Sequence, residues 1–176
     1  YALDEEDTEE IKAIAQKLSH PEIIAERVES LKKAFPEKPL ENAENMLLYL
    51  ERLDFIGDIL PQQIKDASRF VEKLSAPLKA QTSGEYEKLA VYFVYRYFLK
   101  AVRDFDLLSK IKAMIVFVFA AEVINLSREQ DAPARFETVK ELCKEIEYSG
   151  DNMDRIYDDS YLSDIFSDIS MLALLE

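Results

Sequence analysis

Apolar residues recur three and four positions apart along most of this chain, which is the spacing of one face of an α-helix. The pattern is densest in EYEKLAVYFVYRYFLKAVRDFDLLSKIKAMIVFVFAAEVINL. It predicts two long helices here, at about residues 85–104 and 107–126, joined by a turn at Asp104 to Asp106. Both are expected to be central, because aromatic residues fall on several sides of the first and the second is apolar throughout Ala113 to Ala121.

The same periodicity predicts shorter helices before and after this pair. Proline and glycine separate them, with Gly57 and Pro61 limiting a helix of about residues 41–58, and Gly150 ending one of about residues 134–148. The first seven residues are acidic and are expected to be frayed. We therefore predict an all-α fold, a single-domain bundle of about 6–8 helices around the two central ones, over residues 1–176.

Composition supports the helical prediction and excludes some classes of binding partner. The chain has 176 residues with only 3 Gly and 6 Pro, too few for the turns of a many-stranded fold. Its formal net charge of −13 repels nucleic acid and anionic membranes. The longest uncharged apolar run is too short to span a membrane, and the one cysteine suits a reducing compartment. We expect a soluble, cytoplasmic protein and, since the chain starts at Tyr1, a piece of a longer one.

Residues that often carry catalysis are sparse. His20 is the only histidine and stands beside a proline, and Cys143 is the only cysteine, on an apolar stripe with acidic neighbours that raise a thiol's pKa. Three isolated glycines form no phosphate-binding loop. Acidic pairs such as Asp104/Asp106 and Asp158/Asp159 are more simply solvated carboxylates. The sequence therefore predicts no metal site and identifies no catalytic residue.

One group of polar residues lies among the apolar ones of the two long helices. These candidate pocket-lining residues are Tyr92, Tyr95, Arg96 and Lys100 on the first helix and Glu122 on the second. Three of the four on the first helix share a face by their spacing of four. The group either lines a pocket or fixes the register of the helices through a buried ion pair.

An antiparallel arrangement of the two helices would decide which residues meet. Residues equidistant from the turn come opposite each other, such as Arg96 and Met114. Glu122 would then lie near Glu87, Lys88 and Val91, so Lys88 is a better partner for it than Arg96.

Three stretches carry a resemblance to a known family: MLLYLERLDFIGDIL, YFVYRYFLKAVRDFDLLSKIKAMIVFVFAAEVINL and VKELCKEIEYSGDNMDRIYD. They resemble the C-terminal helical part of bacterial flagellin lysine-N-methylase-like proteins, from about Asn45 to Asp158. The family's late acid-His-Ser-acid-acid-Asn pattern is matched at Glu147 to Asn152, except at Tyr148 and Gly150. No catalytic residue is transferred to this chain.

The resemblance implies a parent protein that transfers a methyl group from S-adenosylmethionine to lysines of flagellin or another protein. It also implies an N-terminal cysteine cluster that holds an iron-sulfur or metal centre. With Cys143 alone this chain lacks that cluster, so no cofactor is expected in it and it should not methylate by itself. Two other interpretations stay open. One is a ligand-sensing or dimerising module of a bacterial regulator, and the other is an acidic protein-interaction domain.

Overall fold

The computed structural model describes residues 9, 12–14, 16–17, 20–34, 39–74, 83–129 and 131–175. The chain divides into two compact units, residues 1–37 and 38–176. In the first, helix α2 spans Pro21–Ala34, with Pro21 in its first turn, where a missing N–H is tolerated. The expected frayed terminus, residues 1–7, lies outside the described residues.

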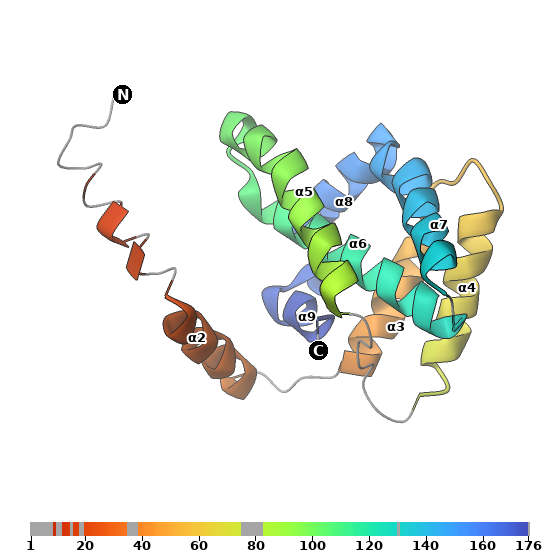
Figure 1. Ribbon diagram of the computed structural model, residues 1–176, viewed down its shortest axis with the longest axis horizontal. Helices are drawn as coiled ribbons and strands as arrows, with labels where there is room; N and C mark the ends of the chain where they lie inside the picture. The colour runs from red at the N-terminus through yellow and green to blue at the C-terminus, as the bar shows by residue number, and fades with distance from the viewer. Residues whose placement is uncertain are drawn as a thin grey trace. The chain divides into compact units, whose positions relative to one another are not determined.

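The second unit is a helical bundle, and the described residues contain no strand, which confirms the all-α prediction. Figure 1 shows its arrangement. The helices are α3 (Pro39–Leu50), α4 (Ile59–Val71), α5 (Ser83–Asp104), α6 (Leu107–Ser127), α7 (Ala132–Leu142), α8 (Gly150–Leu162) and α9 (Asp168–Ala173). Two short turns interrupt the series, the π-helical η1 (Cys143–Glu147) and the 3₁₀ η2 (Asp164–Phe166).

Helix α6 is the centre of the bundle. It packs against α4, α5, α7, α8 and α9, and nearly all its residues from Ala113 to Asn125 are buried. Only Met114 and Glu122 in that span are partly exposed. The uninterrupted apolar run is therefore the signature of a helix covered on all sides, as predicted.

Helices α5 and α6 are antiparallel in the predicted register. The rings of Phe93 and Phe117, which are equidistant from the turn, lie 4.6 Å apart. Asp106 caps α6 by accepting a hydrogen bond from the backbone of Ser109 at 3.1 Å. The boundaries, Ser83–Asp104 and Leu107–Ser127, fall within two residues of those expected.

The prediction that α5 is also central is wrong. Its inner face is buried through Tyr86, Phe93 and Tyr97, but its outer face is open, with Tyr95 81% and Leu99 71% exposed. The helix is apolar on both faces because an exposed stripe of large side chains lies opposite the buried one. Apolar content alone does not separate these two situations.

Two smaller boundary predictions are also corrected. α3 stops at Leu50, and Pro61 lies in the first turn of α4, where a missing N–H is tolerated. Gly150 begins α8, with Ser149 as its N-cap, and does not end the preceding helix. No helix of the described residues is long and apolar enough to cross a membrane.

Candidate functional site

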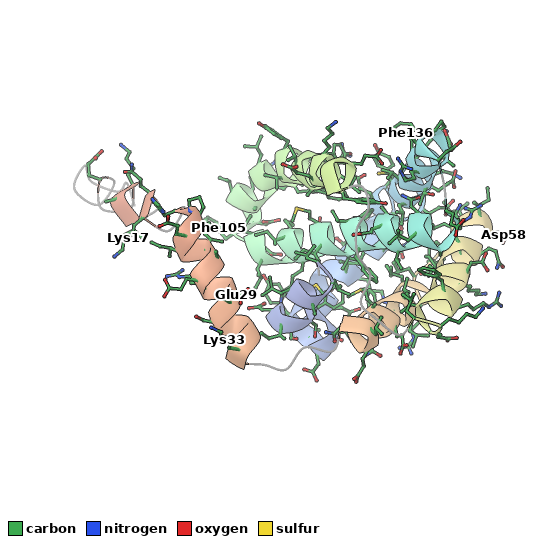
Figure 2. The ribbon with its side chains drawn as sticks, turned by 60° about the horizontal axis from the view of Figure 1, so that its bottom comes forward. Lys17, Glu29, Lys33, Asp58, Phe105 and Phe136 are labelled. Carbon is green, nitrogen blue, oxygen red and sulfur yellow. The ribbon has the colours of Figure 1, made fainter. Side chains whose placement is uncertain are left out.

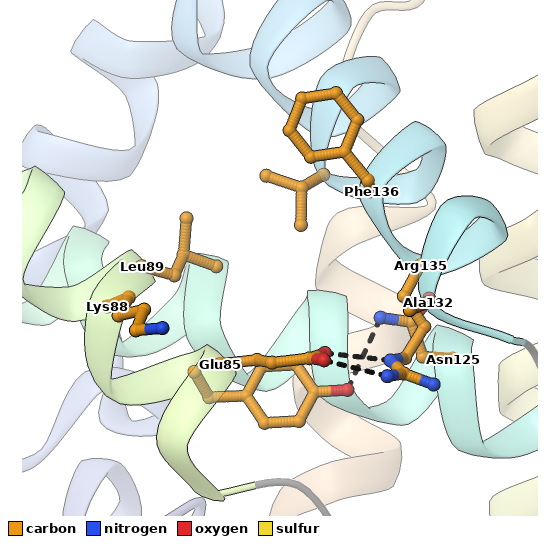
Figure 3. Close-up of a pocket in the computed structure, with 9 residues that line it drawn as sticks. Glu85, Lys88, Leu89, Asn125, Ala132, Arg135 and Phe136 are labelled. Atoms are coloured by element: carbon orange, nitrogen blue, oxygen red, sulfur yellow. Dashed lines mark hydrogen bonds and ion pairs between the residues drawn. The ribbon is translucent and has the colours of Figure 1, made fainter.

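A pocket of about 400 Å³ opens between α5, α6 and α7, within the size range of small-molecule sites. Most of its surface is apolar. It is lined by Glu85, Tyr86, Lys88 and Leu89 of α5, Asn125 of α6, and Ala132, Arg135, Phe136 and Val139 of α7. In Figure 3, Leu89 and Phe136 stand on opposite walls, while Glu85 and Arg135 meet along one edge.

Local capping positions the α7 wall. Asp131 is the N-cap and accepts a hydrogen bond from the backbone of Ala134 at 3.0 Å. A proline follows in the first turn, which favours helix initiation at this point. The next turns therefore present Arg135, Phe136 and Val139 to the pocket.

A bidentate ion pair between Arg135 and Glu85 forms the polar edge of the pocket. Arg135 Nε and Nη2 donate to the two carboxylate oxygens of Glu85 at 2.8 and 2.7 Å. The hydrogen bond from Arg135, together with the charges of Arg135 and Lys88, holds the pKa of Glu85 below its usual value. Beneath it, Asn125 Nδ2 donates to the hydroxyl of Tyr86 at 3.3 Å. This edge is polar and ordered, whereas the rest of the pocket is apolar.

A second pocket, of about 360 Å³, is polar. It lies between α3 and the end of α8, and it is lined by Asn45, Leu48, Tyr49, Arg52, Arg155, Asp159, Ser163 and Ile165. Several of its polar groups bond to each other: Tyr49 donates to Asp159 at 3.0 Å, and Arg155 donates to the Arg52 carbonyl at 2.8 Å. A ligand there would have to compete with these bonds, so the apolar pocket is the better candidate.

Two of the sequence-predicted site residues, Tyr92 and Arg96, meet around a carboxylate that the sequence did not single out. One oxygen of Glu147 accepts hydrogen bonds from the hydroxyls of Tyr92 and Tyr97, at 3.0 and 2.8 Å. Arg96 Nε lies 2.6 Å from the same oxygen. The Glu147 side chain is fully buried, so α5 and the end of the α7 segment are joined through an interior charge.

This cluster changes the protonation of its neighbours. Burial and the charge of Glu147 raise the pKa of the Tyr92 and Tyr97 hydroxyls, which remain hydrogen-bond donors. Burial and the same carboxylate raise the pKa of Cys143 to about 12. The thiol is therefore protonated and unreactive at neutral pH, as expected from its acidic surroundings.

The π-helical turn η1 explains how both Glu145 and Glu147 come to lie in the interior. Its signature is the hydrogen bond from the Tyr148 N–H to the carbonyl of Cys143, at 2.9 Å. Glu145 reaches the α3–α4 loop and accepts from the N–H groups of Ile56 and Gly57 at 2.8 and 3.3 Å. A Cβ on Gly57 would come within 3.1 Å of Glu145, so glycine suits this close approach.

The other predicted site residues are dispersed. Tyr95 points to solvent, and Lys100 lies over the ring of Tyr97 at 4.7 Å. None of the five predicted residues lines either pocket described above.

The ion pair expected between Glu122 and Lys88 is not found among the described residues, and Arg96 pairs with Glu147 instead. Burial alone raises the pKa of Glu122. Periodicity placed Arg96 correctly on α5, but the partner comes from η1, a turn without a sequence signature.

The described residues contain no group of three or more His, Cys, Asp or Glu side chains arranged to hold a metal ion. His20 lies exposed at the start of α2. Comparison of the chain with known protein families, curated proteins and solved structures finds no match to any of them.

Proposed function

We propose that the bundle is a binding module for a small amphipathic molecule, with an apolar body and one anionic group, held in the α5–α6–α7 pocket. The observation that carries the proposal is the pocket itself: about 400 Å³, mostly apolar, and polar at one edge. Pockets of this kind are typical of sites for small organic ligands.

The apolar walls of the pocket favour a ligand with an apolar body. Leu89, Phe136 and Val139 line the pocket, and Phe136 is 68% exposed. Covering such surface gains about 25 cal/mol for each Å² removed from water. A ligand placed between α5 and α7 would gain most of its affinity from this contact.

The charges that line the pocket favour a ligand with an anionic group. Glu85 and Arg135 neutralise each other, which leaves Lys88 as the excess charge among the lining residues. The chain as a whole carries −13, so this small positive region stands out from the surrounding field. A carboxylate or sulfonate at the pocket's edge would be attracted to Lys88.

Two fluorescent probes test the proposal. Anilinonaphthalene sulfonate carries an apolar ring system and one negative charge, and N-phenylnaphthylamine is its neutral counterpart. We expect the full chain to bind both, and Val139→Phe, which fills the pocket, to weaken both at least tenfold. Lys88→Gln should weaken only the sulfonate, by about threefold to fivefold, as expected for loss of an exposed charge contact of up to about 1 kcal/mol.

Matched controls use residues outside the pocket. Ile59→Phe adds similar bulk to an exposed position of α4, and Lys65→Gln removes an exposed charge from the same helix. Neither should change binding of either probe. Unchanged binding to Val139→Phe, with its fold intact by circular dichroism, would refute the pocket as the binding site.

A second candidate function is the one implied by the resemblance, a C-terminal domain of a flagellin lysine-N-methylase-like protein in the bacterial cytoplasm. One observation favours it: two stretches that carry the resemblance meet at one point. Tyr92, Arg96 and Tyr97 come from the first stretch, and Glu147 comes from the second. The two stretches therefore contribute to one interior cluster of this chain.

A methyl-transfer assay tests this second candidate function. Incubation of this chain alone with flagellin and labelled S-adenosylmethionine should give no labelled lysine. The complete protein, including any cysteine-rich segment encoded upstream, should give labelled lysine. An active isolated chain would contradict the domain's proposed supporting role, and an inactive complete protein would remove the methylase interpretation.

A further inference from the structure

The outer face of α5 carries an uninterrupted stripe of exposed large apolar residues. Val91, Tyr95, Leu99 and Val102 follow each other at intervals of four, four and three residues, and each is at least 47% exposed. This spacing places them along one line of the helix. The stripe runs from Val91 to Val102, about 17 Å along the 22-residue helix, and is more than the scattered apolar residues of an ordinary surface.

The stripe ends at a turn that is held rigidly by polar side chains. Phe105 is 91% exposed and has a left-handed backbone, with φ of 58°, which is uncommon for a bulky residue. Figure 2 shows it at the end of the bundle where α5 and α6 meet. Lys110 Nζ lies 3.0 and 3.2 Å from the carboxylates of Asp104 and Asp106 on either side of it. The turn thus fixes the direction in which the end of α5 presents its apolar surface.

We propose that this face binds a second copy of the same chain, with the two α5 helices packed antiparallel about a two-fold axis at Tyr95. In that register, residues whose numbers add to 190 come level with each other. Tyr95 meets Tyr95 of the second copy, and Val91 meets Leu99 of the second copy. The stripe is then self-complementary, because large apolar side chains face large apolar side chains along its centre.

The distribution of charged residues along α5 favours antiparallel over parallel packing of the two copies. Glu87 lies near the start of α5 and Arg103 near its end; both are exposed, and their numbers add to 190, so they come level with each other in this register. Antiparallel packing therefore brings Glu87 of each copy beside Arg103 of the other and opposes the helix dipoles favourably. Near the centre, Arg96 is already paired with Glu147. A parallel pair would instead place like charges together at both ends.

Cysteine crosslinking tests the register in the full chain, in a Cys143→Ala background. Tyr95→Cys should form a covalent dimer on oxidation. Val91→Cys should not link to itself, since the two copies of residue 91 would lie about 12 Å apart along the axis. It should link when mixed with Leu99→Cys. Self-linking of Val91→Cys at least as fast as that of Tyr95→Cys would refute the antiparallel arrangement.

The mass of the native chain in solution tests the interface independently. Light scattering should give twice the 20.4 kDa of one chain, and Tyr95→Glu should raise the dissociation constant at least a hundredfold. Ile56→Glu is the control, because Ile56 is equally apolar and 95% exposed but lies in the α3–α4 loop. A monomeric native chain, or equal weakening by Ile56→Glu, would overturn the proposal.

Discussion

Replacing Glu147 by alanine is expected to lower the free energy of unfolding by about 3 kcal/mol, the low end of the range for breaking a buried ion pair. The low end applies because Arg96 is 39% exposed and can return to water. The larger part of the loss comes from Tyr97, which is 5% exposed and whose hydroxyl donates to Glu147, because it would have to find another acceptor in a region with little water. Urea unfolding followed by circular dichroism measures the change.

Two further variants separate the contributions at Glu147. Glu147→Gln keeps an oxygen for the tyrosines and loses the charge, so it should cost less than alanine. Glu141→Ala is the matched control, since its carboxylate pairs with Lys144, whose side chain is 58% exposed, at 3.4 Å. That control should cost under about 1 kcal/mol. Equal effects of Glu147→Ala and Glu141→Ala would show that the buried cluster does not stabilise the fold.

Replacing Asn152 by alanine is expected to cost about 2–3 kcal/mol, because one buried amide serves three backbone groups. Its Nδ2 donates to the carbonyls of Asp54 and Glu145 at 2.6 and 3.0 Å, and its Oδ1 accepts from the Asp54 N–H at 3.0 Å. No other residue type of this size offers both functions. The loop between α3 and α4 should therefore loosen.

Hydrogen exchange identifies where the Asn152 variant acts. The amides of Asp54, Ile56 and Gly57 should exchange faster, while those in the middle of α6 should change only with global stability. Asn152→Asp should be nearly as harmful, because a carboxylate cannot donate to the two carbonyls. Asp154→Ala, at an exposed position of the same helix, should change stability by under about 0.5 kcal/mol. Unchanged exchange at Asp54 would contradict this role.

The sequence predicted those parts of the fold that depend on periodicity. The apolar run from Ala113 to Ala121 identified α6 as a covered helix, and the short turn at Asp104 to Asp106 fixed its antiparallel packing with α5. It did not predict the outer face of α5, because Leu99 and Val102 have the same character whether they are covered or exposed. Burial depends on which neighbours are present, and a single helix does not specify them.

The candidate site was predicted less well for a geometric reason. Arg96 and Tyr92 were correctly grouped on one helix, but their partner Glu147 lies 55 residues beyond Tyr92. The Glu147 side chain points into the interior because the π-turn inserts an extra residue, and α-helical spacing does not predict that insertion. The pocket walls were missed for a related reason. Leu89 and Val139 are ordinary stripe residues, and the space between them depends on how α5 and α7 pack together, which neither helix specifies by itself.

The π-turn also bears on the order in which the chain can complete its fold. Glu145 bonds to backbone groups 88 and 89 residues earlier, and Asn152 bonds to the N–H and the carbonyl of Asp54, 98 residues earlier. By contrast, α5 and α6 are neighbours in sequence and can pair as soon as both exist, since closing so short a loop costs little entropy. During synthesis, the hairpin can form first. The α3–α4 loop gains its anchors only after the ribosome has added this late segment.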